Sequence, residues 1–292
     1  MAGLVTTTRR FLSVFKLRIS AAITLCAIAG MAITPGMSLS YQKVLVLALA
    51  LFLSSASAGA FNQFAERDLD ARMPRTRDRP FVTGEFRAGW RWLTGICALL
   101  ALAVGGVAFV LNARVALYTF LGAFAYGVVY TIWLKQRSVW NIVIGGLAGS
   151  FAVLAGAAAI NPDLAPTSII LAVVLFLWTP PHFWSLAIVL HKDYEAAGIP
   201  MLPVVMGDAA AARIILAHTI ALVALTLLPM AFGMGAIYFI GAFLGGGIFL
   251  KCSVDLVLDP GPRKAMRNFH ASLFQLTLLL IVAIIDGSLN LG

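Results

Sequence analysis

Charged residues are scarce in this chain. Only 11% of its 292 residues are Asp, Glu, Lys or Arg, whereas 61% are hydrophobic, and the mean hydropathy is +0.95. Soluble domains carry roughly a quarter charged residues, so this composition excludes a soluble globular protein and a disordered one. Cysteine is scarce as well, since Cys26, Cys97 and Cys252 lie in or beside apolar runs without Cys-x-x-Cys spacing. This arrangement excludes a disulfide framework and a thiolate metal site.

Long apolar runs, by contrast, fill most of the chain. A membrane-spanning helix needs about 20 mostly apolar residues, and nine such runs lie at about 19–36, 44–61, 93–112, 115–134, 141–160, 166–190, 213–231, 235–250 and 270–290. We therefore predict an all-α, polytopic membrane protein in which nine transmembrane helices form one bundle around a central cavity. A single integral-membrane domain is expected over residues 1–292, with a short cytoplasmic amino-terminal segment over 1–18. Prolines at 180, 181 and 229 leave open a split of the sixth run or a merger of the seventh and eighth.

The basic residues are distributed unevenly between the two sides of these runs. Nineteen of the 21 Lys and Arg residues lie in the amino-terminal segment and in or beside the loops after the second, fourth, sixth and eighth runs. Positive charge is retained in the cytoplasm during membrane insertion, so we expect the amino terminus inside and the carboxyl terminus outside. The net charge of +9 then follows from topology, and we expect contact with membrane lipid and none with nucleic acid.

Acidic residues gather on the same predicted side. Ten of the 12 lie there, and the insertion rule does not explain them because it depends on Lys and Arg. After the second run, Asn62, Glu66 and Asp70 recur every four residues and would share one face of a helix. Crowded carboxylates repel one another, and Mg²⁺ relieves such repulsion, using one or two carboxylates together with water and substrate phosphates. We therefore predict a Mg²⁺ site at these three residues.

Arginines follow this acidic stripe directly. They are Arg72, Arg75, Arg77 and Arg79. A guanidinium group binds phosphate oxygens in a bidentate manner, so the acidic and basic residues together predict a site for a metal-bound diphosphate. The simpler alternative is a solvated helix end with ordinary carboxylate–arginine pairs.

Two further loops carry the same kinds of side chain on the same predicted side. Lys192 and Asp193 follow the sixth run, and Lys135 and Arg137 follow the fourth. The alternative for the latter pair is that these charges only determine topology. A diphosphate site at the end of an apolar bundle suits a long hydrocarbon diphosphate, because a dry cavity shields an allylic cation from water.

Four segments together resemble one branch of the UbiA-type intramembrane prenyltransferases. Asn62, Glu66 and Asp70 match the Asn-x-x-x-Asp/Glu-x-x-x-Asp motif of that superfamily. The branch that they resemble is the haem branch, the protoheme IX farnesyltransferases or haem O synthases. The four segments are NQFAERDLDARMPRTRDRP (62–80), YTIWLKQRSVWNIVIGG (130–146), WTPPHFW (178–184) and KDYEAAGIPMLPV (192–204). The first motif marks the superfamily, whereas the four together are specific to the haem branch.

This resemblance implies a Mg²⁺-dependent enzyme of the bacterial inner membrane. Such an enzyme joins the farnesyl group of farnesyl diphosphate to a vinyl group of haem B and forms haem O as diphosphate leaves. The resemblance implies that the catalytic and Mg²⁺-binding residues are Asn62, Glu66, Asp70 and Asp193. The diphosphate contacts that we expect are Arg72, Arg75, Arg79, Lys135, Arg137 and Lys192. Ala197 stands where other branches have a second aspartate, which leaves the number of Mg²⁺ ions open.

One histidine is a candidate ligand for haem. Haem iron commonly takes an axial His, and His182 lies inside the sixth run, directly after Pro180 and Pro181. An ionisable residue within a membrane span is a functional hypothesis by default, so we predict that His182 binds haem. The alternative is a hydrogen bond to a backbone group that the two prolines leave free.

Three other functions remain open. Prenyl transfer to an aromatic ring or to a chlorophyll-type tetrapyrrole would need the same metal site, and only acceptor assays distinguish it. A secondary transporter would place its ionisable residues near the middle of the membrane. A passive haem-binding assembly factor would need no cluster of acidic residues and arginines. We also expect partners in the haem pathway or in oxidase assembly, whereas the sequence does not indicate an oligomeric state.

Overall fold

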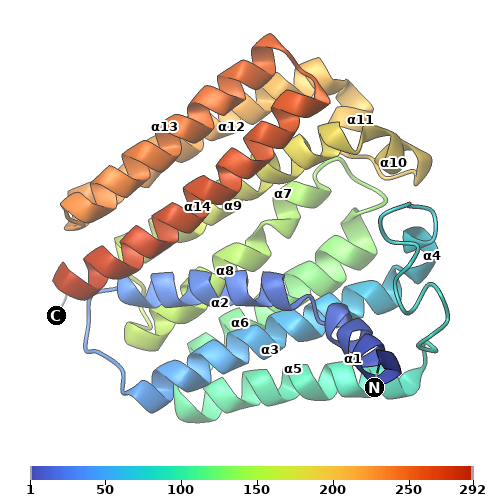
Figure 1. Cartoon of the computed structure of the whole chain (residues 1–292). Coiled ribbons are helices and arrows are strands. Elements are labelled where there is room, and N and C mark those ends of the chain that lie inside the picture. Colours follow the sequence, from blue (N-terminus) through green and yellow to red (C-terminus); the bar gives the residue numbers. More distant parts are fainter. Residues whose placement is uncertain (1, 291–292) are drawn as a thin grey trace.

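The computed structural model describes residues 2–290, and the side chains of residues 8–289. Every regular element in this range is a helix (Figure 1). The first half contains α1 (Ala2–Val14), α2 (Leu17–Ala32), α3 (Tyr41–Ala65), α4 (Arg67–Asp70), α5 (Trp90–Val110), α6 (Ala113–Phe124), the π-helix η1 (Ala125–Leu134), α7 (Asn141–Gly145) and α8 (Leu147–Ile160). The second half contains α9 (Pro166–Val189), α10 (His191–Ala196), α11 (Leu202–Met206), α12 (Asp208–Leu227), the 3₁₀-helix η2 (Leu228–Phe232), α13 (Ala236–Leu258) and α14 (Pro262–Asn290).

The helices confirm the predicted membrane architecture. In the described range, eight are long and apolar enough to cross a membrane: α3, α5, α6 with η1, α7 with α8, α9, α12 with η2, α13 and α14. The helix α2 has 16 residues and therefore measures about 24 Å, which is short for a hydrocarbon core of about 30 Å. Together with the end of α1 it forms a ninth candidate span, bent by 45°. The protein is an integral membrane protein, and the prediction of nine spans agrees with this count.

The bend between α1 and α2 is centred on Lys16. This residue has φ 48° and ψ 48°, the left-handed conformation that residues with a side chain seldom adopt. The carbonyl oxygen of Lys16 accepts hydrogen bonds from the backbone N–H groups of Ile19 (2.9 Å) and Ser20 (3.1 Å), which start α2. The bend directs the Lys16 side chain toward α3, where it enters the site described below.

The spans pack in two groups. The helices α2, α3, α5, α6 and α8 contact one another, as do α9, α12, α13 and α14. Figure 1 shows the two groups one above the other, and contacts of α8 with α9 and of α2 with α14 join them. One buried apolar cluster includes residues of both groups, such as Ile33, Leu171 and Leu279. The predicted central cavity stays a prediction, because both cavities described for this structure flank the bend between α1 and α2.

Glycines allow the closest helix crossing in the first group. A Cβ atom placed on Gly156 of α8 would lie 1.8 Å from the carbonyl oxygen of Ala27 in α2. A Cβ atom on Gly30 of α2 would lie 2.2 Å from the carbonyl oxygen of Val153. The backbones of α2 and α8 therefore touch at these two positions, as in other membrane helix pairs with small residues at the interface.

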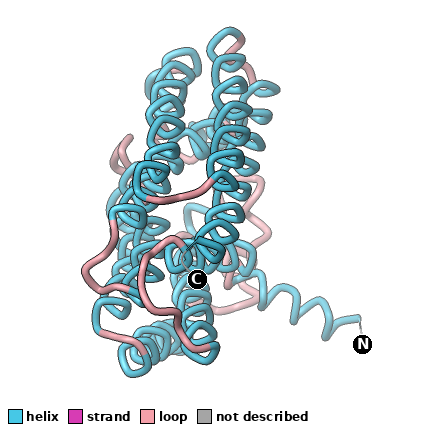
Figure 2. Tube along the Cα trace, turned by 90° about the vertical axis from the view of Figure 1, so that its left-hand side faces the viewer, coloured by secondary structure: helices cyan, strands magenta, loops and turns pink. Residues whose placement is uncertain are grey.

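The two ends of the bundle carry different segments of the chain. The segments with α4 and α10 lie at one end, and the carboxyl terminus lies at the other (Figure 1). Figure 2 shows α1 extending from the side of the bundle. Between the ends, large apolar side chains face outward, for example Phe109, Ile240 and Phe243, which suits contact with lipid.

Candidate active site

Three polar side chains are buried where α3 passes into α4. Asn62, Glu66 and Asp70 are only 2%, 4% and 2% exposed. Although α3 ends at Ala65, the backbone N–H of Glu66 still donates to the Asn62 carbonyl (3.0 Å), and that of Asp70 to the Glu66 carbonyl (2.7 Å). These i to i−4 bonds preserve the helical repeat across the break, so the three side chains share one face.

Each of these side chains accepts a hydrogen bond from a different cationic residue. Lys16 Nζ lies 2.5 Å from Asn62 Oδ1. Lys135 Nζ lies 2.5 Å from Glu66 Oε2, and Arg79 Nη1 lies 2.5 Å from Asp70 Oδ2. Buried charges are tolerated only when they are paired in this way. Three cationic side chains thus contact one buried row that consists of an amide and two carboxylates.

One oxygen in this cluster has no partner. Glu66 Oε1 is buried and forms no hydrogen bond with any described residue. The described side chains also contain no group of three His, Cys, Asp or Glu residues that could hold a metal by themselves. Mg²⁺ typically takes only one or two carboxylates and fills its shell with water and phosphate oxygens. The oxygen atoms of Asn62, Glu66 and Asp70, with one carboxylate oxygen unpartnered, therefore fit a cation that also binds a diphosphate.

The segment after α4 folds back over this cluster. Thr76 Oγ1 donates to the Asp70 carbonyl (2.8 Å), and Met73 is buried beneath the segment. This turn brings Arg79 to Asp70, nine residues earlier in the chain. Arg72 is exposed, and its guanidinium forms no hydrogen bond or ion pair with the described side chains.

Arg75 links this segment to α10. Its Nη2 lies 3.3 Å from the Tyr194 hydroxyl, and its guanidinium lies 5.8 Å from the centre of the Tyr194 ring. Burial raises the pKa of Tyr194 above its ordinary value, the Arg75 guanidinium opposes this rise, and the carboxylates of Glu66 and Asp193 add to it. Tyr194 is thus within electrostatic range of both predicted acidic motifs.

The remaining predicted charges lie around this cluster without touching it. Asp193 is partly exposed, and Lys192 and Arg137 are exposed. Among the described residues, none of these three side chains forms a hydrogen bond or an ion pair. Of the predicted site residues, the structure therefore pairs Glu66 with Lys135 and Asp70 with Arg79, places Asn62 on the same face as the two carboxylates, and leaves Asp193 at the same end of the bundle.

The π-helix η1 contributes Tyr126 and Thr131, which the sequence did not indicate. Thr131 Oγ1 accepts a hydrogen bond from Asn62 Nδ2 (3.0 Å), and the Tyr126 hydroxyl accepts one from Lys16 Nζ (2.9 Å). The rings of Tyr126 and Tyr130 are stacked with centroids 5.6 Å apart, and Lys135 Nζ lies 5.9 Å from the Tyr130 ring centre. The backbone N–H of Lys135 donates to the Tyr130 carbonyl, five residues earlier (2.9 Å). Single π-helical turns often occur at functional sites.

His182 lies in a second buried site, between α9 and α14. Its ring is stacked between Trp178 and Phe269, with centroids 4.2 Å and 4.4 Å away. Its Nδ1 lies 2.7 Å from Ser272 Oγ, and the single hydroxyl proton of Ser272 is donated to the Phe269 carbonyl (2.7 Å). With its proton so placed, Ser272 Oγ is the acceptor for the Nδ1 proton, and on this arrangement we assign the lone pair to Nε2. The alternative interpretation expected a hydrogen bond from His182 to a backbone group beside the prolines. Among the described residues, His182 forms no such bond.

The other three histidines have other surroundings. His191 Nδ1 pairs with Asp208 (2.8 Å), His218 Nδ1 lies 3.0 Å from the Ile214 carbonyl, and His270 packs edge-on against Phe269. Among the described residues, Nε2 of His182 forms no hydrogen bond. Of the four, His182 is the one that the aromatic rings of two spans hold inside the bundle.

Comparisons with known proteins show the family to which the chain belongs. The model of the UbiA prenyltransferase family matches residues 23–279. "Protoheme IX farnesyltransferase 2" of Paramagnetospirillum magneticum is 60% identical over 274 residues, which cover 94% of this chain and 95% of that protein. "Protoheme IX farnesyltransferase 1" of the same organism is 45% identical, with 96% and 99% covered.

Solved structures show the same fold at low sequence identity. A digeranylgeranylglyceryl phosphate synthase structure superposes with a TM-score of 0.80 at 16% identity and covers 96% of this chain and 98% of its own. A UbiA homologue from Archaeoglobus fulgidus bound to DMAPP and Mg²⁺ gives a TM-score of 0.70 at 16% identity, covering 92% and 99%. The family model and the 60% identical relative span nearly the whole chain, and this protein belongs to the UbiA prenyltransferase family.

Proposed function

We propose that this protein is a haem farnesyltransferase that converts haem B to haem O. The C1–O bond of farnesyl diphosphate breaks, and diphosphate leaves with the bonding electrons. The vinyl group of haem B then forms a carbon–carbon bond to the farnesyl C1, and water adds to the resulting cation and loses a proton, which gives the hydroxyethylfarnesyl substituent. The observation that carries this proposal is the buried row of Asn62, Glu66 and Asp70, each paired with a cationic residue, in a chain 60% identical to a named protoheme IX farnesyltransferase.

Asn62, Glu66, Asp70 and Asp193 are the residues that would hold Mg²⁺ in this reaction. Bound there with the diphosphate, the cation supplies Lewis-acid stabilisation of the departing charge. Support comes from the unpartnered Oε1 of Glu66 and from the fold shared with a homologue bound to DMAPP and Mg²⁺. Asp193 is partly exposed at the same end of the bundle, and we assign it as the ligand from the second acidic motif.

Basic side chains bind the diphosphate and stabilise it as it leaves. Of the basic residues predicted from the sequence, Lys135 and Arg79 contact the acidic row and Arg75 contacts Tyr194, and we assign these three the central contacts. The exposed side chains of Arg72, Arg137 and Lys192 attract the diphosphate from the membrane surface. Preorganised cations act most strongly in a water-excluded site, and the burial of Lys135 provides such a site.

His182 binds the iron of haem B through Nε2. The hydrogen bond to Ser272 and the rings of Trp178 and Phe269 hold the imidazole in one orientation. Binding of the iron positions the vinyl group against the farnesyl cation, and productive orientation accounts for much of the rate enhancement of such two-substrate reactions.

The protein resides in the inner membrane of a bacterium. The end of the bundle with α4 and α10 faces the cytoplasm, because most Lys and Arg residues lie there. This orientation gives a soluble magnesium ion and farnesyl diphosphate access to the site. Proteins that deliver haem B or receive haem O for oxidase assembly complete the set of proposed partners.

A reconstituted assay tests the proposal. The full-length protein in detergent is incubated with farnesyl diphosphate, haem B and Mg²⁺, and the extracted pigment is identified by mass spectrometry. We expect haem O, its loss when EDTA is added, and its return when excess Mg²⁺ follows. Unaltered haem B under all three conditions, with product formed from an aromatic acceptor instead, would reject haem as the acceptor while preserving prenyl transfer.

A further inference from the structure

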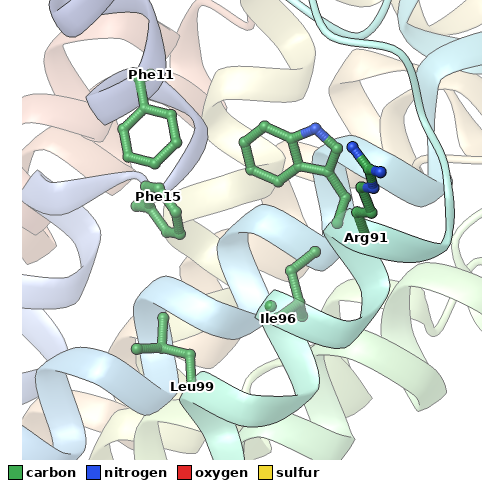
Figure 3. Close-up of a pocket in the computed structure, with 7 residues that line it drawn as sticks. Phe11, Phe15, Arg91, Ile96 and Leu99 are labelled. Carbon is green, nitrogen blue, oxygen red and sulfur yellow. The ribbon is translucent and has the colours of Figure 1, made fainter.

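A groove opens on the side of the bundle between α1 and α5. Its volume is about 360 Å³. Phe11 of α1 and Phe15 of the bend after it form one wall, and Trp92, Ile96 and Leu99 of α5 form the other, with Arg91 at one end (Figure 3). None of the four segments that resemble the haem branch lines this groove.

The groove runs along the direction of the membrane span. Arg91 is in the first turn of α5, and Leu99 follows eight residues later, a distance of about 12 Å along the helix. Beyond Arg91 the named wall residues are apolar, so the groove is polar at its mouth and apolar inside. This profile matches a lipid, whose head group lies at the interface and whose acyl chain enters the hydrocarbon region.

The charge at the mouth specifies the kind of lipid. Arg91 is exposed and, among the described residues, has no carboxylate partner. Arg9 of α1 and Arg87, four residues before Arg91, are likewise exposed and have no carboxylate partner among the described residues, whereas Glu85 is paired with Arg10. An anionic head group would supply the missing negative charge, since a basic residue near a membrane surface attracts anionic lipids.

We propose that this groove binds one anionic phospholipid. Its phosphate contacts Arg91, and one acyl chain lies between Phe11 and Phe15 on one side and the aliphatic residues of α5 on the other. The lipid thereby bridges two helices, and α1 leads directly to Lys16, whose Nζ contacts Asn62 and Tyr126. A lipid at this position supports the wall of the active site that Lys16 forms. The binding step itself does not depend on the proposed haem chemistry.

Gly95 allows the groove to be filled without disturbing the protein. A Cβ atom placed there meets no protein atom within 4 Å, and the residue lines the groove. Gly95→Leu therefore occupies the space assigned to the acyl chain. Gly105→Leu is a matched control, because Gly105 lies on the same helix, also has open space around its Cβ position, and is outside the groove.

Native mass spectrometry of the full-length protein tests the proposal. The protein is exposed to equal amounts of phosphatidylglycerol and phosphatidylcholine and then released from detergent. We expect the wild type and Gly105→Leu to retain one phosphatidylglycerol, Gly95→Leu to lose it, and Arg91→Gln to reduce the preference for phosphatidylglycerol about fivefold.

Three results would overturn the proposal. They are equal retention of the two lipids by the wild type, full retention of phosphatidylglycerol by Gly95→Leu, and displacement of the lipid by excess farnesyl diphosphate, which would assign the groove to the prenyl chain. Because the readout is lipid retention, it is independent of haem O formation.

Discussion

The buried carboxylate of Asp70 pairs with the partly exposed Arg79, which connects the acidic row with the arginine segment. In the proposed reaction, the Asp70 carboxylate binds Mg²⁺ and pairs with Arg79, so that their positive charges lie beside the leaving diphosphate. We expect Asp70→Asn to reduce haem O formation by at least about 100-fold, the usual cost of removing one preorganised electrostatic contact. The measurement is the rate of haem O formation by purified enzyme, with folding checked by size-exclusion chromatography.

Asp68 offers the matched control for this change. Its side chain is 86% exposed and has only a long ion pair with Arg67, 4.0 Å. Asp68→Asn removes the same charge from the same short segment, so we expect a rate close to that of the wild type. Equal losses in the two variants would attribute the effect to net charge and not to the buried row.

Ser272 is the residue that fixes the tautomer of His182. Because Ser272 Oγ accepts the Nδ1 proton, Ser272→Ala removes that constraint, and we expect haem affinity to fall about 10- to 100-fold, as when the hydrogen-bond partner of a metal-binding His is removed. The measurement is a haem titration followed by the Soret band. Ser150→Ala is the control, since Ser150 is equally a buried serine and donates to the Ala172 carbonyl; a similar fall there would indicate general loosening of the bundle.

Single residues also show how far the sequence could predict the site. Asn62, Glu66 and Asp70 were predictable because their spacing survives the break between α3 and α4. Lys16 was not, because its approach to Asn62, 46 residues away, depends on a left-handed bend that no local pattern signals. Arg72 was expected at the diphosphate on proximity alone; it is exposed and contacts none of the acidic row, so this contact stays a prediction.

At the scale of elements, the π-helix explains another group that periodicity could not reveal. In an α-helix, Tyr126 and Lys135 would lie on roughly opposite faces, because nine residues at about 100° each make two and a half turns. The i to i−5 bond from Lys135 to Tyr130 widens the turn, so residues four or five apart face the same side. Tyr126, Thr131 and Lys135 consequently reach one cluster.

The crossing of α2 and α8 gives a prediction about stability. Gly156→Ala would place a Cβ atom 1.8 Å from the Ala27 carbonyl oxygen, so the two helices must separate, and we expect a loss of about 1–3 kcal/mol. The measurement is the thermal unfolding midpoint in one detergent. Gly149→Ala, on the same helix, meets its nearest atom at 3.7 Å and should keep or raise the midpoint; a Gly156→Ala midpoint equal to that of Gly149→Ala would contradict the close crossing.

At the scale of the whole molecule, the number and order of the spans were predictable because apolar runs of about 20 residues have few alternatives in a membrane. The first span is the exception. The run predicted at about 19–36 corresponds to α2, which ends at Ala32. A bend of 45° separates α2 from α1, the helix before it. Composition locates a span, whereas its bend depends on side chains such as Phe11, which packs against Phe86 and Trp92 from a distant part of the chain.

The charge distribution predicts the orientation of the molecule in the membrane. Nineteen of 21 Lys and Arg residues belong to the amino-terminal segment and to the loops after alternate spans, and retention of positive charge places these segments in the cytoplasm. Alkaline phosphatase, which is active only outside the cytoplasm, should be active when fused after Gly292 and inactive when fused between α13 and α14, at Gly261. An active fusion at Gly261 with an inactive one at Gly292 would reverse the orientation. The buried acidic row would then face away from the cytoplasm, and farnesyl diphosphate would have to cross the membrane to reach it.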